Sequence, residues 1–273
     1  MAIVYHYCSP QAFLQIIERK CIWLSSTNNM NDFSEGEWFS KALRMVLAEK
    51  EMVYGEQWCE AVWRYFVENL TPKYITCFSK NNDSLSQWRA YAQDGEGVSI
   101  GFDEEFLGAK GKFINPHSDI EKSLCLCDVN YLSHHEIKDA LIKQANEILE
   151  EEKDNPNKQE GVEWFADLCV SLAMEVKNPA FEEECEKRLV YSADIKASSE
   201  GLLEVKNPIG EMRHRISNGY LTSYFEFGLL VQDAIKEITL GPKNKFHNID
   251  IQNFLGLNSL SHIHVKRSSA TYR

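Results

Sequence analysis

Residues 4–26 read VYHYCSPQAFLQIIERKCIWLSS and carry the signals for a strand, a helix and a second strand. Val4 to Cys8 has the alternating pattern of a strand. Ser9-Pro10 is a typical helix start, because serine caps the first turn and proline tolerates the first helical position. Residues 21–25 predict a second strand. This opening therefore predicts a protein of mixed α and β structure.

The rest of the chain also contains both helical and strand-like segments. Apolar residues recur at helical spacing over 34–50 and 55–69, which predicts a helical hairpin, and again over 133–152 and 162–174. We expect further strands at 74–79, 97–102, 125–131, 188–191, 220–230, 235–240 and 262–266. These elements predict an α+β fold with a mixed or antiparallel sheet core. We expect a single domain, residues 1–273, with helical insertions at about 34–70 and 133–175.

Composition and charge favour a cytoplasmic protein. No apolar run approaches the roughly 18 residues that a membrane-spanning helix requires, and the first residues lack the features of a secretory signal. The eight cysteines are scattered, several of them in strand-like segments, which favours reduced, buried thiols. A formal net charge of −12 repels a phosphate backbone, so we expect no broad nonspecific binding of nucleic acid.

Several common enzyme motifs are absent from the sequence. It contains no phosphate-binding loop, no dinucleotide-binding glycine fingerprint, no nucleophile elbow and no H-E-x-x-H. Cys125 and Cys127 are the only close pair of cysteines, and no second pair at metal-ligand spacing accompanies them. We therefore predict no metal site.

Two polar clusters precede or follow predicted strands. Asn31 and Asp32 lie just before the first long helix, where they could bind a ligand or simply cap that helix. Trp88 and Tyr91 are three residues apart and share one helical face, with Arg89 beside them. Aromatic residues at this spacing are commonly core residues, but an arginine beside a tryptophan also suits a stacked anionic nucleotide.

A third cluster is acidic and stands just ahead of Arg188. If residues 184–188 form a strand, Glu184, Glu186 and Arg188 project from the same face. Two carboxylates beside a guanidinium can have pKa values that are pushed apart, an arrangement used for acid, base or oxocarbenium-stabilising chemistry. The alternative is a solvated acidic helix end.

The motifs together resemble a known bacterial family. Eight motifs of the chain resemble domain-of-unknown-function family 2971. They are YHYCSP at 5–10, IWLSS at 22–26, MNDFSE at 30–35, ITCFS at 75–79, SLSQWRAY at 84–91, GVSIGF at 97–102, FEEECEKRLV at 181–190 and SSATYR at the end. The departures are small: Cys8 stands where threonine is more usual, and Lys187 where an aromatic residue often stands. The family name by itself implies no activity.

The opening segment also looks like the start of ADP-ribosyltransferases, in which a strand histidine holds a ribose of NAD and a later glutamate stabilises the oxocarbenium-like transition state. This resemblance implies NAD as co-substrate, an unknown macromolecular acceptor and a role as a toxin or phage-defence effector. It assigns His6 to the ribose and matches the strand end at Ser25. Glu184 or Glu186 would be catalytic, Trp88 or Tyr91 would stack, and Arg89 or Arg188 would neutralise the pyrophosphate.

We therefore expect one shared pocket for a nucleotide-like small molecule. Its predicted residues are His6, Ser25, Asn31, Asp32, Trp88, Arg89, Tyr91, Glu184, Glu186, Arg188, Tyr272 and Arg273. Two alternatives remain open. The same residues would serve a non-catalytic nucleotide-sensing or protein-interaction module, or Asp32, Glu35 and Glu184 would serve a metal-dependent nuclease.

Overall fold

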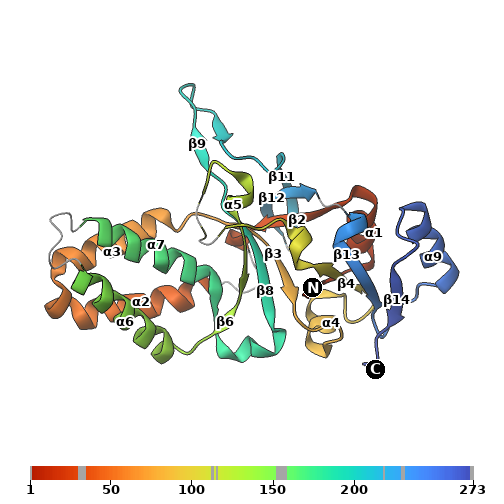
Figure 1. The fold of residues 1–273 in the computed structure, drawn as a ribbon, viewed down its shortest axis with the longest axis horizontal. Coiled ribbons are helices and arrows are strands. Elements are labelled where there is room, and N and C mark those ends of the chain that lie inside the picture. The colour runs from red at the N-terminus through yellow and green to blue at the C-terminus, as the bar shows by residue number, and fades with distance from the viewer. Residues whose placement is uncertain are drawn as a thin grey trace.

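A mixed, mostly antiparallel sheet forms the centre of the molecule (Figure 1). The computed structural model describes residues 2–29, 35–111, 114, 116–151, 159–217, 219–228 and 231–270. Within them, the strand order is β11-β12-β2-β3-β1-β4-β13-β14, and β8 and β5 continue the sheet from β3. The predicted α+β class is therefore confirmed.

The strands of this sheet come from the whole length of the chain. They are β1 (Ile3–Cys8), β2 (Cys21–Ser26), β3 (Tyr74–Ser79), β4 (Val98–Asp103), β5 (Leu124–Asp128), β8 (Glu186–Tyr191), β11 (Met212–Ser217), β12 (Tyr220–Gly228), β13 (Ile235–Leu240) and β14 (His264–Arg267). Two small pairs lie outside it: β6 (Asn130–Tyr131) with β7 (Val176–Lys177), and β9 (Ile195–Ala197) with β10 (Leu203–Val205).

The sheet divides at β3. One edge of β3 pairs with β8 along its whole length, from Tyr74 to Ser79. The other edge is shared, since β2 pairs with its first two residues and β1 pairs only at Ser79. Between these contacts β1 and β2 separate, and residues 76–78 have no strand partner on that edge among the described residues. This division creates a gap in the middle of the sheet.

Helix α1 (Pro10–Arg19) connects the two strands that separate. Ser9 caps it as its sequence predicts, because the Ser9 hydroxyl accepts a hydrogen bond from the backbone N–H of Ala12. Phe13 and Ile17 are fully buried in the main core beneath the sheet. The capping signal in the sequence and the burial of the apolar face of α1 therefore both favour the same helix.

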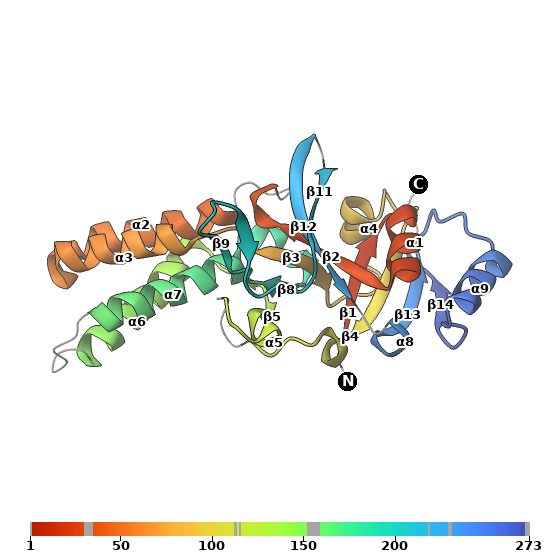
Figure 2. The same ribbon diagram turned by 90° about the horizontal axis from the view of Figure 1, so that it is seen from above.

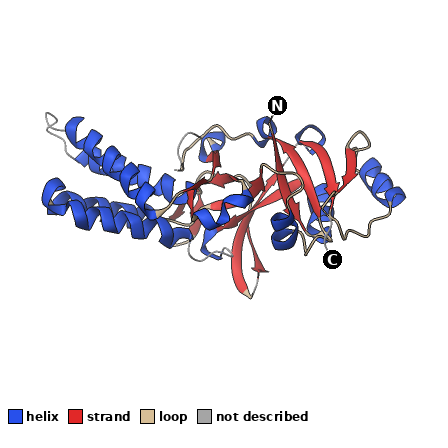
Figure 3. Cartoon of the chain, turned by 90° about the horizontal axis from the view of Figure 1, so that it is seen from below, coloured by secondary structure: helices blue, strands red, loops and turns tan. Residues whose placement is uncertain are grey.

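Four helices form a lobe at one end of the molecule (Figures 2 and 3). They are α2 (Glu35–Tyr54), α3 (Glu56–Asn69), α6 (His134–Glu151) and α7 (Gln159–Glu175). Their apolar faces enclose a separate core, which includes Phe39, Phe66 and Phe165. The lobe lies where the helical periodicity predicts helices: α2 and α3 lie between β2 and β3 in the chain, and α6 and α7 lie between β5 and β8.

Shorter elements complete the described chain. They are α4 (Leu85–Tyr91), α5 (Ile120–Ser123), α8 (Val231–Ala234), α9 (Asn248–Leu257), and the 3-10 turns η1 (Thr27–Asn29), η2 (Glu104–Leu107) and η4 (Pro179–Glu184). No helix in the described part of the chain is both long and apolar enough to cross a bilayer.

One prediction about a local element was wrong. Glu184 does not lie in a strand with Glu186 and Arg188, because it ends the 3-10 turn η4. Cys185 follows in the left-handed region, with φ of 45°, and the strand begins only at Glu186. The left-handed backbone at Cys185 turns the chain so that Glu184 and Glu186 both contact Lys177.

Candidate functional site

His6 lies on β1 at the gap between β1 and β2. Its Nδ1 is 3.0 Å from the carbonyl oxygen of Cys77, one of the β3 residues that lacks a strand partner on this edge. A carbonyl can only accept, so Nδ1 carries the proton and Nε2 is left as an acceptor. Burial lowers the pKa of His6, although the hydrogen bond to Cys77 acts in the opposite direction. A neutral imidazole therefore stands at the gap.

Arg215 enters the same region from β11. Its guanidinium lies 4.9 Å from the ring centre of Trp23 on β2, and its Nη2 donates to Ser25 Oγ at 3.1 Å. Among the described residues no carboxylate lies within 4.0 Å of it, and its buried Nε has no hydrogen-bond partner. Burial lowers the pKa of Arg215, but arginine stays charged at neutral pH. It is therefore a half-buried cation that no acid of the described residues contacts.

A cavity of about 260 Å³ joins these residues. Its polar lining comes from His6, Ser25, Arg215, Thr76 and Gln15. Its apolar surface comes from Trp23 and residues of α1. The combination of one cation, hydroxyls and an aromatic ring is typical of a site for an anionic group attached to a ring or sugar. Ligand pockets usually span about 300–1,000 Å³, so this cavity suits one part of a nucleotide.

Glu226 is a carboxylate beside Trp23, one of the residues that line this cavity. It lies opposite Trp23 in the register of β12 and β2. Residues that face each other across paired strands share a face of the sheet, so Glu226 stands on the same face as Trp23. Its Oε1 is 3.2 Å from Arg19 Nη1 and 3.7 Å from Arg213 Nη1, and its side chain is 23 % exposed. A carboxylate therefore stands directly across the strand pair from Trp23, which lines the cavity.

A second polar group lies at the start of β8. Lys177 Nζ is 2.6 Å from Glu184 Oε2 and 3.2 Å from Glu186 Oε2. Arg188 holds Glu186 in a two-point contact, with Nε to Oε1 at 2.7 Å and Nη2 to Oε2 at 3.0 Å. We call Lys177, Glu184, Glu186 and Arg188 the ion cluster. Its two cations and two anions compensate each other in a region that is almost fully buried.

Hydroxyl groups complete the ion cluster. Tyr91 donates to Glu184 Oε1 at 3.0 Å, and Ser79 donates to the Glu184 carbonyl at 2.7 Å. Burial alone would raise the pKa of Glu186, but Arg188, Lys177 and the Cys77 thiol outweigh it and lower the pKa to about 2. Glu186 is therefore ionised at neutral pH and is a poor proton donor.

The described candidates form two groups rather than one pocket. His6 and Ser25 line the cavity, whereas Tyr91, Glu184, Glu186 and Arg188 belong to the ion cluster. The register explains the separation. Tyr5 pairs with Ser79, and Ser79 pairs with Glu186, so these three share a face and His6 points from the opposite one. The expectation of a single shared pocket is not met by the described residues.

The remaining candidates have other positions. Trp88 is fully buried, packs against Tyr7 with ring centres 4.8 Å apart and donates to Asp83 Oδ1, so it has no surface for stacking on a ligand. Arg89 lies on the exposed side of α4. Asn31, Asp32, Tyr272 and Arg273 lie outside the described residues.

Sequence reasoning missed Trp23, Arg215 and Glu226. Strand β11, which carries Arg215, was not predicted, because MRHRIS at 212–217 has three polar residues in its interior and lacks the alternation of apolar and polar residues. The pairing of β11 through β12 to β2 is a long-range contact that local patterns do not encode. The signal that was available is the alternation of Arg213 and Arg215, which puts two cations on one strand face.

Metal ligands do not gather in the described part of the chain. No group of three or more histidine, cysteine or acidic residues there has the spacing to hold a metal ion. All eight cysteines are free thiols, as expected for reduced side chains. Asp32, which the nuclease alternative requires, lies outside the described residues.

Comparison with known proteins gives one family match. Residues 87–189 match the model of a family described as Protein of unknown function (DUF2971). The family predicted from the motifs is thereby confirmed, over a segment that runs from α4 into β8 and includes the whole ion cluster. Neither the curated proteins nor the solved structures contain a match to the chain.

Proposed function

We propose that the cavity between β1 and β2 binds a nucleotide of the NAD type. The observation that carries this proposal is Arg215. A half-buried guanidinium without a carboxylate partner is costly, and an anionic ligand group offsets that cost.

The neighbours of Arg215 suit the rest of such a ligand. Trp23 and Ser25 hold the guanidinium in one orientation, so a phosphate can approach it in a two-point contact. His6 Nε2 is an acceptor for a ribose hydroxyl. The cavity holds one nucleoside-sized part of the ligand, and the remainder would lie over the outer face of β2 and β12.

Calorimetric titration of the full chain with NAD tests this proposal. We expect Arg215→Gln to weaken binding by about 10-fold or more, because a charge-assisted hydrogen bond contributes about 1.5–3 kcal/mol. Arg213→Gln is the matched control, since Arg213 lies two residues away on the same strand but contacts Glu211 and Glu226. Equal affinity of the two variants, or no binding of NAD to the parent chain, would refute the proposal.

ADP-ribosyl transfer is the second candidate function, and Glu226 favours it. In this reaction the C1′–N bond of NAD breaks and nicotinamide leaves with the electron pair. An acceptor nucleophile then bonds to C1′ and loses its proton. The developing positive charge on the ribose requires a nearby carboxylate. Glu226 lies opposite the cavity residue Trp23 and pairs with Arg19 and Arg213, whereas Glu184 and Glu186 are bound within the ion cluster. The predicted role as a toxin or phage-defence effector depends on this transferase activity.

Release of nicotinamide from NAD separates a transferase from a sensor. If the chain is a transferase, Glu226→Gln should lower the release rate by about 100-fold or more while the Kd for NAD changes little. Glu211→Gln, at an exposed acid just before β11, is the control. NAD binding without any nicotinamide release would assign the chain to non-catalytic sensing.

A further inference from the structure

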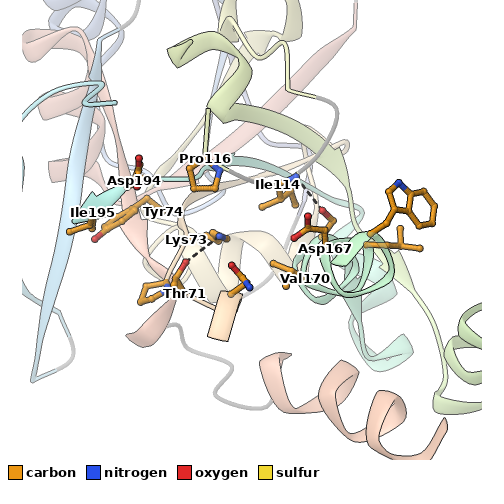
Figure 4. A pocket seen from close by; sticks show the side chains of 15 residues that line it. Thr71, Lys73, Tyr74, Ile114, Pro116, Asp167, Val170, Asp194 and Ile195 are labelled. Carbon is orange, nitrogen blue, oxygen red and sulfur yellow. Dashed lines mark hydrogen bonds between the residues drawn. The ribbon is translucent and has the colours of Figure 1, made fainter. Parts of the chain in front are cut away.

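A larger cavity lies where the helical lobe meets the sheet, and Arg215 is not among the residues that line it (Figure 4). It has a volume of about 510 Å³ and is lined by the end of α3, one face of α7, the approach to β3 and the chain after β8. This volume falls within the range of about 300–1,000 Å³ that is typical of small-molecule pockets.

Lys73 is the central polar residue of this cavity. It is only 3 % exposed, and its Nζ has one hydrogen bond, to the neutral hydroxyl of Thr71 at 3.3 Å. Figure 4 shows the amine between Thr71 and Asp167. The Lys73 backbone is fixed by reciprocal contacts with Thr27, at 2.9 and 3.2 Å, so the side chain is directed into the cavity from a rigid base.

Asp167 on α7 does not form an ion pair with Lys73. No carboxylate of the described residues lies within 4.0 Å of the Lys73 amine. Burial lowers the pKa of Lys73 to about 8 and raises the pKa of Asp167, whereas a close ion pair would shift both in the opposite directions. Asp194, the other acid of the lining, is engaged by Lys196 at 3.0 Å. At neutral pH the cavity therefore contains a buried, mostly protonated amine that no described carboxylate contacts, although Asp167 attracts it from beyond ion-pair distance.

The rest of the lining limits the ligand. Trp164, Leu168, Val170 and Ile114 supply an apolar wall, which suits a ring or a short aliphatic body. Asp167 disfavours a ligand with several negative charges, because a second charge would lie near this carboxylate. We infer that this cavity binds a small molecule with a single carboxylate and an apolar body, with Lys73 as the counter-ion of the carboxylate. This site is independent of the nucleotide site proposed above.

Benzoate and benzamide are the probes for this inference, because they have nearly the same shape and differ in charge. Calorimetric titration of the full chain at pH 7 should show benzoate binding at least about 10-fold more tightly than benzamide. Lys73→Met should remove this preference, and Asp167→Asn should strengthen benzoate binding. Lys245→Met, at an exposed lysine outside the cavity, is the matched control.

A proton measurement provides a second readout. Benzoate should raise the pKa of Lys73, so titrations near pH 8 in two buffers of different ionisation enthalpy should show proton uptake that is absent from Lys73→Met. Equal binding of both probes, equal benzoate affinity after Lys73→Met, or no benzoate binding at up to about 10 mM would overturn the inference. Asp167→Asn still tests it if Lys73→Met fails to fold.

Discussion

Two lysines of this chain are almost equally buried and have opposite surroundings. Lys177 is 4 % exposed and contacts both Glu184 and Glu186, whereas Lys73 is 3 % exposed and contacts only a hydroxyl. Burial alone therefore does not distinguish a structural charge from a ligand-binding one. The difference lies in the distance to the acids: Glu184 and Glu186 lie within 3.2 Å of Lys177, whereas no described carboxylate lies within 4.0 Å of Lys73 and Asp167 attracts it only from farther away.

The ion cluster should be the most sensitive part of the molecule to the loss of one charge. Glu186→Gln leaves Arg188 and Lys177 with one anion fewer, and we expect the free energy of unfolding to fall by about 3–5 kcal/mol. Denaturant unfolding at pH 7 measures this loss. Glu183→Gln, at an exposed neighbour, should change it by less than about 0.5 kcal/mol.

The pH dependence of the same pair of variants checks the cause. Glu186 has a folded pKa of about 2, below its ordinary value of 4.5, so its contribution is complete above about pH 4.5. That contribution is lost as the pH falls from 4.5 toward 2. Stability should therefore drop less steeply over this window in Glu186→Gln than in the parent chain, and identical slopes would contradict the proposed pairing.

Replacement of each buried lysine by methionine should have effects of opposite sign. Lys177→Met should destabilise the chain by a few kcal/mol, because it leaves two carboxylates facing a single arginine. Lys73→Met should stabilise it by up to about 3 kcal/mol at pH 7, because burial of the protonated amine outweighs its attraction to Asp167 and lowers its pKa from 10.5 to about 8.

The Lys73 effect has its own pH signature. Below about pH 8 the amine is protonated in both the folded and the unfolded chain, so the whole cost of burying the charge is present. Between about pH 8 and 10.5 the folded chain loses its proton first, and parental stability should rise toward that of Lys73→Met. Thermal unfolding from pH 7 to 11 measures this convergence, and a constant gap would refute it.

Much of the fold was predictable because its signals are local. Ser9 and Pro10 start a helix wherever the chain permits one, and the periodicity of residues 35–69 requires amphipathic helices. The candidate site was only partly predictable. His6 and Ser25 were identified and do line one cavity, but Arg215 comes from an exposed strand without a strong local pattern.

The grouping of the acids shows the same limit. Alternation along a strand correctly joins Glu186 to Arg188, since side chains two residues apart share a face. It fails for Glu184, whose position depends on the left-handed turn at Cys185, and it cannot place Lys177, which arrives from the end of α7. The buried position of Trp88 also depends on a distant residue, Tyr7.

The amino-acid sequence alone determined the helices, most strands, the α+β class and the family, because hydrophobic periodicity, capping and motif order are properties of neighbouring residues. Only the tertiary structure decided which charges meet. The register of β1, β3 and β8 puts His6 and Glu186 on opposite faces, and Lys73 is buried in the cavity between α7 and the start of β3 with no described carboxylate in ion-pair contact. Electrostatic pairing depends on distances of a few ångströms between residues far apart in the chain, and those distances exist only after folding.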